Sequence, residues 1–192
     1  MLDKNYWTQR YVENNTPWDI GYACPAILKY FEQVEDKNQK ILIPGAGNAY
    51  EAEALNRLGF KNVYVLDLSE EPLQNFKNRY PDFPEKNLIL GNFFDHDERY
   101  DFIVEQTFFC AIHPSQRVKY AHKIEELLLP EGKLVGVLFN DELNRDKPPF
   151  GGDKLEYKQL FARYKQLKME DNIHAIGPRA GRELFILLQK TT

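Results

Sequence analysis

The chain has few cysteines and no long apolar run, and both shortages narrow the range of possible functions. Its 192 residues include only two cysteines, Cys24 and Cys110, which form no CxxC pair. They cannot supply a disulfide framework or a thiolate zinc site, and we expect no metal site. No run approaches the roughly 18 apolar residues of a membrane span, and the N-terminus lacks the layout of a secretion signal. We therefore expect a cytoplasmic protein with no membrane partner.

An excess of positive charge is also missing. The sequence has 25 basic and 29 acidic residues, which gives a formal net charge of -4. That balance offers no electrostatic footprint for nucleic acid or for an anionic membrane surface. We therefore expect no nucleic-acid partner.

Short apolar runs alternate with longer amphipathic segments, after an aromatic-rich N-terminal segment (residues 1–24) that we expect to be irregular. No repeat or linker interrupts the chain, so residues 1–192 are expected to form a single domain. The patterns predict strands over 40–44, 62–67, 88–90, 100–104, 133–139, 166–170 and 183–188, and helices over 48–58, 69–80, 114–129 and 153–164. No helix joins the last two strands, so one terminal strand should be antiparallel. The prediction is a Rossmann-like α/β fold: a seven-stranded, mostly parallel sheet with an antiparallel terminal strand and helices on both faces.

Ligands of open parallel sheets bind beyond the carboxyl ends of the strands. The first predicted strand runs into Gly45 and Gly47, which allow a sharp turn and a close approach of the backbone to an anionic ligand. Asp67 closes the second strand, where a carboxylate can accept two hydrogen bonds from a ribose. A tight turn and a helix cap would explain the same residues without a ligand. Together they favour a nucleoside, and the bulky Tyr50 in place of a third glycine favours an adenosyl ligand over a dinucleotide.

The third and fourth strands end in polar and aromatic residues. Asn92 and Phe93 suit the edge and face of an adenine base, although a turn with a core phenylalanine is equally consistent with them. Glu105 and Gln106 follow the fourth strand, where an acceptor would meet the cofactor. Glu105 and His113 are candidates for proton transfer, and a helix-capping or ion-pairing role would also account for both.

Together with Trp7-Thr8-Gln9-Arg10-Tyr11 and Asn15-Thr16-Pro17-Trp18-Asp19-Ile20-Gly21, these segments resemble the thiopurine S-methyltransferase family of S-adenosylmethionine-dependent enzymes. The nearer resemblance is to its plant halide and thiol methyltransferase branch, which has similar Thr-Pro-Trp-Asp and Thr-Phe-Phe-Cys-Ala-Ile segments. The likeness spans nearly the whole chain. It implies a class I methyltransferase fold, S-adenosylmethionine as cofactor with S-adenosylhomocysteine as product, and methylation of a small nucleophile, a thiol or a halide.

The resemblance also implies roles at matching positions. The N-terminal segment, residues 1–24, would form a lid over the cofactor, Gly45 would line its methionine end, Asp67 would hold the ribose, and Gln106 would lie near the sulfonium and its methyl group. The cofactor-binding candidates are Trp7, Tyr11, Trp18, Gly45, Gly47, Asp67, Leu68, Asn92, Phe93 and Gln106. The catalytic candidates are Glu105, Gln106 and His113.

The sequence departs from the family pattern in three places. Tyr11 stands where the plant branch usually has a second Trp, Asn92 where an Asp is common, and Glu105-Gln106 where the plant branch has Asp-Tyr and the thiopurine enzymes have Asp-Arg. The last departure leaves the acceptor open, since it falls at the expected substrate position. The alternatives are an O- or N-methyltransferase of a small metabolite, a non-catalytic S-adenosylmethionine-binding protein, and a nicotinamide oxidoreductase. We expect a monomer or a small homo-oligomer.

Overall fold

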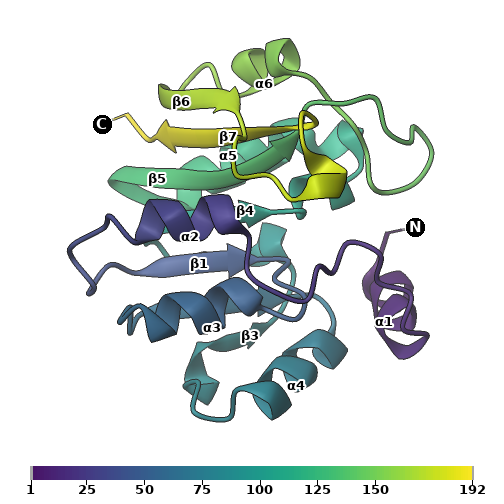
Figure 1. Cartoon of the computed structure of the whole chain (residues 1–192), viewed down its shortest axis with the longest axis vertical. Coiled ribbons are helices and arrows are strands. Elements are labelled where there is room, and N and C mark those ends of the chain that lie inside the picture. Colours follow the sequence, from purple (N-terminus) through teal and green to yellow (C-terminus); the bar gives the residue numbers. More distant parts are fainter. Residues whose placement is uncertain (1, 192) are drawn as a thin grey trace.

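The computed structural model describes residues 2–191, whose strands form one seven-stranded sheet in the order β3-β2-β1-β4-β5-β7-β6 (Figure 1). The strands are β1 (Ile41–Pro44), β2 (Val63–Asp67), β3 (Leu88–Leu90), β4 (Tyr100–Gln106), β5 (Leu128–Phe139), β6 (Lys165–Asp171) and β7 (Glu183–Gln189). Strands β1 to β5 pair in parallel, whereas β7 is antiparallel to both of its neighbours, β5 and β6. The predicted Rossmann-like fold is confirmed, including the antiparallel last strand.

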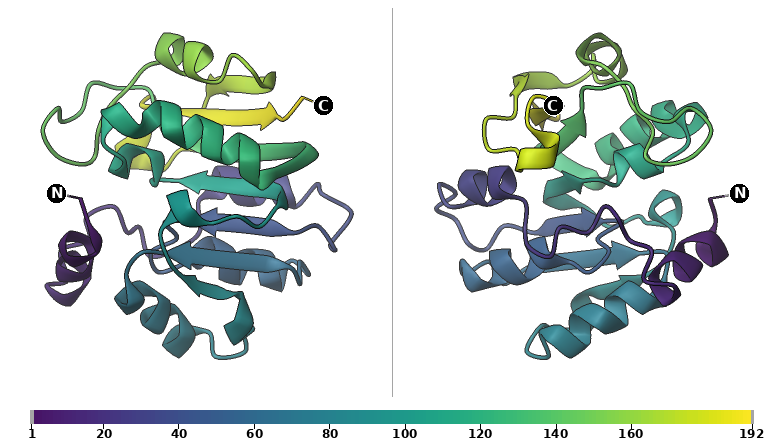
Figure 2. Two further views of the ribbon diagram at one scale, coloured as in Figure 1. Left: turned by 180° about the vertical axis from the view of Figure 1, so that it is seen from behind. Right: turned by 45° about the vertical axis from the view of Figure 1, so that its right-hand side comes forward.

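Helices cover both faces of this sheet. The helices of the described residues are α1 (Lys4–Val12), α2 (Pro25–Phe31), α3 (Tyr50–Arg57), α4 (Glu70–Arg79), α5 (Arg117–Leu127) and α6 (Lys154–Leu160). Helix α1 lies to one side of the sheet and covers neither face (Figure 1). Figure 1 shows α2 and α3 in front of the sheet, and the rear view in Figure 2 shows α5 on the opposite face. Within residues 2–191, no helix has the length and apolar character needed to span a membrane.

The core lies in two layers, one on each face of the sheet. Because successive side chains of a strand point to opposite faces, neighbours on β4 join different clusters. Ile103 packs with Tyr120 of α5, whereas Val104 packs with Ile27 and Phe31 of α2. All five of these residues are buried, so the central strands are covered on both sides, which explains their continuous apolar runs in the sequence.

Several elements differ from the sequence-based prediction, and helix α2 (Pro25–Phe31) was not predicted at all. The N-terminal segment is not irregular throughout, because α1 forms after Asp3, whose side chain accepts the Tyr6 N–H at 3.0 Å as a helix cap. Strand β4 continues to Gln106, which lies opposite Val137 of β5. The helix predicted over 114–129 is interrupted: a 3-10 turn, η4 (Pro114–Gln116), precedes α5, and the chain already enters β5 at Leu128.

Candidate functional site

A tight turn follows β1 at the carboxyl edge of the sheet. Gly45 and Gly47 have φ angles of 56° and 54°, and Ala49 adopts the same left-handed region at 52°. An L-residue pays roughly 1–2 kcal/mol to enter this region, so glycine is favoured at positions 45 and 47. The turn brings the Gly47 N–H to 3.0 Å from Oδ2 of Asp67, at the end of β2. The structure therefore brings together the glycine turn and the carboxylate that the sequence singled out.

Asp67 is only 7% exposed and is held in place by the backbone. Its Oδ1 accepts the Ser69 N–H at 2.9 Å, while Oδ2 accepts the Gly47 N–H. Burial raises the pKa of the carboxyl, and these backbone hydrogen bonds oppose that rise. Each carboxylate oxygen has a second lone pair, so the group can still accept hydrogen bonds from a diol. Leu68 follows directly and is half-buried.

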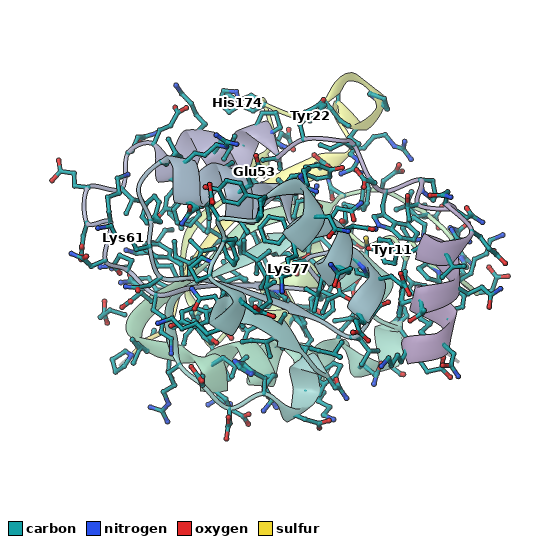
Figure 3. All side chains as sticks on the ribbon, turned by 90° about the horizontal axis from the view of Figure 1, so that it is seen from below. Tyr11, Tyr22, Glu53, Lys61, Lys77 and His174 are labelled. Carbon is teal, nitrogen blue, oxygen red and sulfur yellow. The ribbon has the colours of Figure 1, made fainter. Side chains whose placement is uncertain are left out.

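The three aromatic residues predicted to cover a ligand gather above this turn. The Trp18 ring meets those of Trp7 and Tyr11 edge to face, with centroid distances of 5.6 and 5.9 Å. Figure 3 shows Tyr11 pointing from α1 toward the body of the molecule. Its hydroxyl lies so close to Gly47 that a Cβ there would come within 2.7 Å of it. Burial, together with the charge of Asp67, raises the pKa of Tyr11.

Two side-chain hydrogen bonds connect this N-terminal segment to the start of α4 and to the glycine turn. Thr8 Oγ1 lies 2.9 Å from Ser69 Oγ, which joins α1 to the start of α4. Asp19 accepts a hydrogen bond from Asn48 Nδ2 at 2.5 Å, which joins the Trp18 loop to the glycine turn. The sequence reasoning gave Asp19 no role. Its position next to Trp18 in the Thr-Pro-Trp-Asp stretch is the sequence feature that could have indicated a role.

Beside the turn, phenylalanine rings connect the ends of β1, β3 and β4. The Phe108 ring packs directly against Gly45, where it leaves no room for a side chain. It also meets the buried ring of Phe93 at a centroid distance of 5.2 Å. Asn92 is exposed and caps its own turn by accepting the Phe94 N–H at 3.0 Å. Asn92 and Phe93 thus lie at the predicted edge, and both make the structural contacts that the alternative interpretation expected.

Glu105 is fully buried and surrounded by donors. Its Oε1 accepts the N–H groups of Phe108 and Phe109 at 2.9 and 2.8 Å, and its Oε2 accepts the Tyr120 hydroxyl at 2.6 Å. Burial raises the pKa of this carboxyl to about 7. The side chain holds the turn after β4 in place.

That turn includes one residue with an unfavourable backbone conformation. Thr107 has a φ of 56°, although β-branched residues rarely adopt positive values. Its hydroxyl donates to Oε1 of the preceding Gln106 at 2.6 Å. Strain of this kind persists only where the surroundings fix it, and Glu105 supplies that fixation.

His113 is separated from these contacts. It is exposed, its Nδ1 lies 2.8 Å from Ser115 Oγ, and it caps η4. Its ring meets Phe150 edge to face at 5.5 Å. The structure therefore gives His113 the capping role that the sequence offered as an alternative, and no contact with the glycine turn or Asp67.

The sequence reasoning also missed two charged residues at the same edge of the sheet. Arg179, in the 3-10 turn η5 (Gly177–Arg179), donates from Nη2 to the Trp18 carbonyl at 3.0 Å. Glu183 begins β7 and is only 5% exposed. The contact of Arg179 with Trp18 has no local signal in the sequence, because it depends on the antiparallel return of β7 beside β5.

The chain is similar to known methyltransferases. The family model described as thiopurine S-methyltransferase matches residues 2–183. A relative from Arabidopsis thaliana named "Probable thiol methyltransferase 2" is 29% identical, over 92% of this chain and 81% of that protein. "Thiocyanate methyltransferase 1" from the same plant is 28% identical, over 95% of this chain and 83% of that protein.

A solved structure shows the same fold. It is a Burkholderia thailandensis 1,6-didemethyltoxoflavin-N1-methyltransferase with its substrate and S-adenosylhomocysteine bound. The match has a TM-score of 0.79 and 18% identity, and covers 98% of this chain and 87% of that chain.

Proposed function

This chain belongs to the thiopurine S-methyltransferase family of S-adenosylmethionine-dependent methyltransferases, and from that premise we propose that it methylates a small thiol or a halide. The relatives named as thiol and thiocyanate methyltransferases support this acceptor class. The observation that carries the proposal is the buried Asp67 carboxylate hydrogen-bonded to the glycine turn, because this pair suits a nucleoside. Tyr50 in place of a third glycine favours an adenosyl ligand without a pyrophosphate.

The residues at this edge fit the methyl donor chemically. Asp67 would accept hydrogen bonds from the ribose hydroxyls, and Leu68 would lie beside it. Gly45 and Gly47 would line the methionine end through the turn that their positive φ angles allow. Asn92 and Phe93 would lie at the adenine. Once bound, S-adenosylmethionine supplies a methyl group on a positively charged sulfur.

The N-terminal segment would act as a lid. The Trp7, Tyr11 and Trp18 rings meet edge to face and lie over the turn, where their faces suit a sulfonium. A cation over an aromatic face gains roughly 0.5–2 kcal/mol, depending on how completely water is excluded. The contacts of Thr8 with Ser69 and of Asp19 with Asn48 would keep this segment closed.

Catalysis would depend on alignment more than on proton transfer. A thiol with an ordinary pKa near 8.5 is partly ionised at neutral pH, and a halide carries no proton. Holding the nucleophile in line with the methyl group can lower the barrier by several kcal/mol. Gln106 would lie near the methyl group. Glu105 would position the turn that carries Thr107 and Phe108, because its oxygens are engaged by three donors.

Two measurements on the purified protein test the proposal. Calorimetry should detect binding of S-adenosylmethionine and of S-adenosylhomocysteine. Incubation with methyl-labelled S-adenosylmethionine and a panel of thiols, thiocyanate, iodide, phenols and amines should label the sulfur and halide acceptors. Labelled phenols or amines alone would point instead to an O- or N-methyltransferase. Binding without any methylated product would indicate a non-catalytic protein, and absence of binding would refute the proposal.

A further inference from the structure

Arg117, the first residue of α5, is a buried arginine that the proposed mechanism does not use. It is only 5% exposed. Its Nη1 donates to Oε1 of Glu156 in α6, and its Nη2 donates to the Gly151 carbonyl oxygen, both at 2.6 Å. Its guanidinium also lies over the ring of Phe109, 4.8 Å from the centroid, in the 3-10 turn η3 (Phe109–Ala111). One side chain therefore joins the segment after β4 to the loop after β5 and to α6.

Stability alone does not explain a buried arginine of this kind. Removing a guanidinium from water costs several kcal/mol, and apolar residues of similar volume often stabilise a fold as well or better. The contacts of Arg117 instead fix positions, because the guanidinium is planar and holds its donors in a rigid geometry. The group that it fixes is the Gly151 carbonyl, and with it the loop of residues 140–153.

This loop begins where β5 ends and lies against the segment after β4. Its Phe150 N–H donates to the Cys110 carbonyl oxygen at 2.8 Å. Its two ends are joined by backbone hydrogen bonds between Asp141 and Gly152, at 3.0 and 3.1 Å. Figure 1 shows the loop at the same edge of the sheet as α1 of the proposed lid. Ligands of parallel sheets bind at this edge, so the loop lies where the acceptor is expected.

The loop and η4 enclose a hollow of about 370 Å³. This volume falls within the range of small-molecule sites, roughly 300–1,000 Å³. The hollow is lined by Pro114 of η4 and by residues 140–145 and 150–153 of the loop. Arg117 is not part of this lining and acts on it through Gly151, which is. The hollow is larger than a single sulfur atom requires, so it can receive the carbon body that carries the sulfur of an acceptor.

We propose that this hollow holds the carbon body of a thiol acceptor, and that Arg117 is a positioning residue that keeps the lining loop in place. This inference rests on the proposed function. The acceptor sulfur must lie in line with the methyl group, and a misplacement of about 1 Å can cost on the order of a hundredfold in rate. Within residues 2–191, the side-chain hydrogen bonds of Arg117 go to Glu156 and Gly151 and to no residue of the glycine turn. Loss of Arg117 should therefore affect the acceptor and spare the methyl donor.

The test compares two acceptors, thiophenol and hydrosulfide, under conditions in which both are ionised. Thiophenol has a carbon body that can occupy the hollow, and hydrosulfide has none, so the wild type should have a KM for thiophenol at least about tenfold lower. Arg117→Gln should raise the KM of thiophenol by at least about tenfold, and change the KM and kcat of hydrosulfide by less than about twofold. The affinity for S-adenosylhomocysteine, measured by calorimetry, should also stay within about twofold. Arg117→Lys keeps the charge and should recover part of the loss.

Two further variants keep the inference testable if Arg117→Gln does not fold. Glu156→Gln weakens the same ion pair from the surface, since the Glu156 side chain is 40% exposed, and should raise the KM of thiophenol by a smaller factor. Leu143→Trp enlarges a residue that lines the hollow and leaves Arg117 in place, so it should raise the same KM. Leu167→Trp is the matched control, because Leu167 is 38% exposed on β6 and does not line the hollow. It should leave both KM values unchanged.

Several results would overturn the inference. Equal losses for thiophenol and hydrosulfide in Arg117→Gln, or a matching loss of affinity for S-adenosylhomocysteine, would give Arg117 a purely structural role. An unchanged KM of thiophenol in the Arg117 and Glu156 variants would show that the ion pair does not position the acceptor. An unchanged KM in Leu143→Trp, or a wild type that does not favour thiophenol over hydrosulfide, would show that the hollow does not hold the acceptor. A wild type that binds no S-adenosylhomocysteine or methylates no thiol would instead refute the proposed function.

Discussion

The two halves of the sheet's carboxyl edge are built in different ways. Around β1 and β2, the proposed donor half consists of a glycine turn and an aspartate joined by one hydrogen bond of 3.0 Å. Around β4, β5 and β7, the proposed acceptor half combines a buried glutamate, a strained threonine and an arginine that reaches a carbonyl 161 positions away in the chain. The donor half is local in sequence, whereas the acceptor half depends on the whole topology.

This difference fits the two separate tasks of a methyltransferase, which are to bind the methyl donor and to bind the acceptor. The methyl donor is the same for every member of the family, so one compact arrangement of backbone and carboxylate can serve it. The acceptor varies between members, and a site assembled from several strand ends can change by single substitutions. Departures occur in both halves, but those at Tyr11 and Asn92 keep a ring and a hydrogen-bond acceptor, whereas those at Glu105 and Gln106 fall in the acceptor half.

The largest expected effect is on the donor half. Asp67→Ala removes two hydrogen bonds to the ribose, each worth roughly 1.5–3 kcal/mol because the acceptor is charged. The affinity for S-adenosylhomocysteine should fall by at least about a hundredfold in calorimetry. Asp82→Ala, at an exposed position, is the control and should bind normally. A folded Asp67→Ala protein with unchanged affinity would refute the ribose assignment and, with it, the contrast between the halves.

Sequence reasoning therefore worked where the information was local. The strands, the antiparallel ending and the pairing of Gly47 with Asp67 all followed from short patterns. Helix α1 was missed because it has no buried side chain and hence no apolar stripe. The contact of Arg179 with Trp18 could not be predicted, because it requires the β5, β7 and β6 order. The sequence left His113 between a proton-transfer role and a capping role, and its contacts with Ser115 and Phe150 in the folded chain decide for the cap.

The second expected effect concerns pH and the acceptor half. The pKa of Glu105 is about 7 in the folded protein, against an ordinary value of 4.5. A raised pKa means that the folded state holds this proton more tightly. This tighter proton binding stabilises the folded state. The stabilisation is fully present below pH 4.5 and is lost as the pH rises to about 7. Glu105→Gln cannot titrate, so its free energy of unfolding should fall less over this range, by on the order of 1–3 kcal/mol.

Urea unfolding at several values between pH 4.5 and 8 measures this difference. Glu170→Gln provides the comparison, because Glu170 is exposed on β6 and should leave the wild-type pH dependence unchanged. Parallel curves for the wild type and Glu105→Gln would show that Glu105 is not the group that titrates. The stability of the acceptor half would then depend on pH no more than that of the donor half. The two halves would differ only in how their residues are brought together by the topology.

The smallest expected effect links the lid to the glycine turn. Gly47→Ala places a methyl group 2.7 Å from the Tyr11 hydroxyl and forces alanine to a φ of 54°, which together should cost about 1–2 kcal/mol in unfolding experiments. Tyr11→Phe removes the obstructing oxygen, since the next ring atom is 3.9 Å away. The alanine should therefore destabilise the Tyr11→Phe protein less than the wild type, and a double-mutant cycle gives that coupling. Additive losses would mean that backbone strain alone explains Gly47, and that Tyr11 does not close upon the turn in solution.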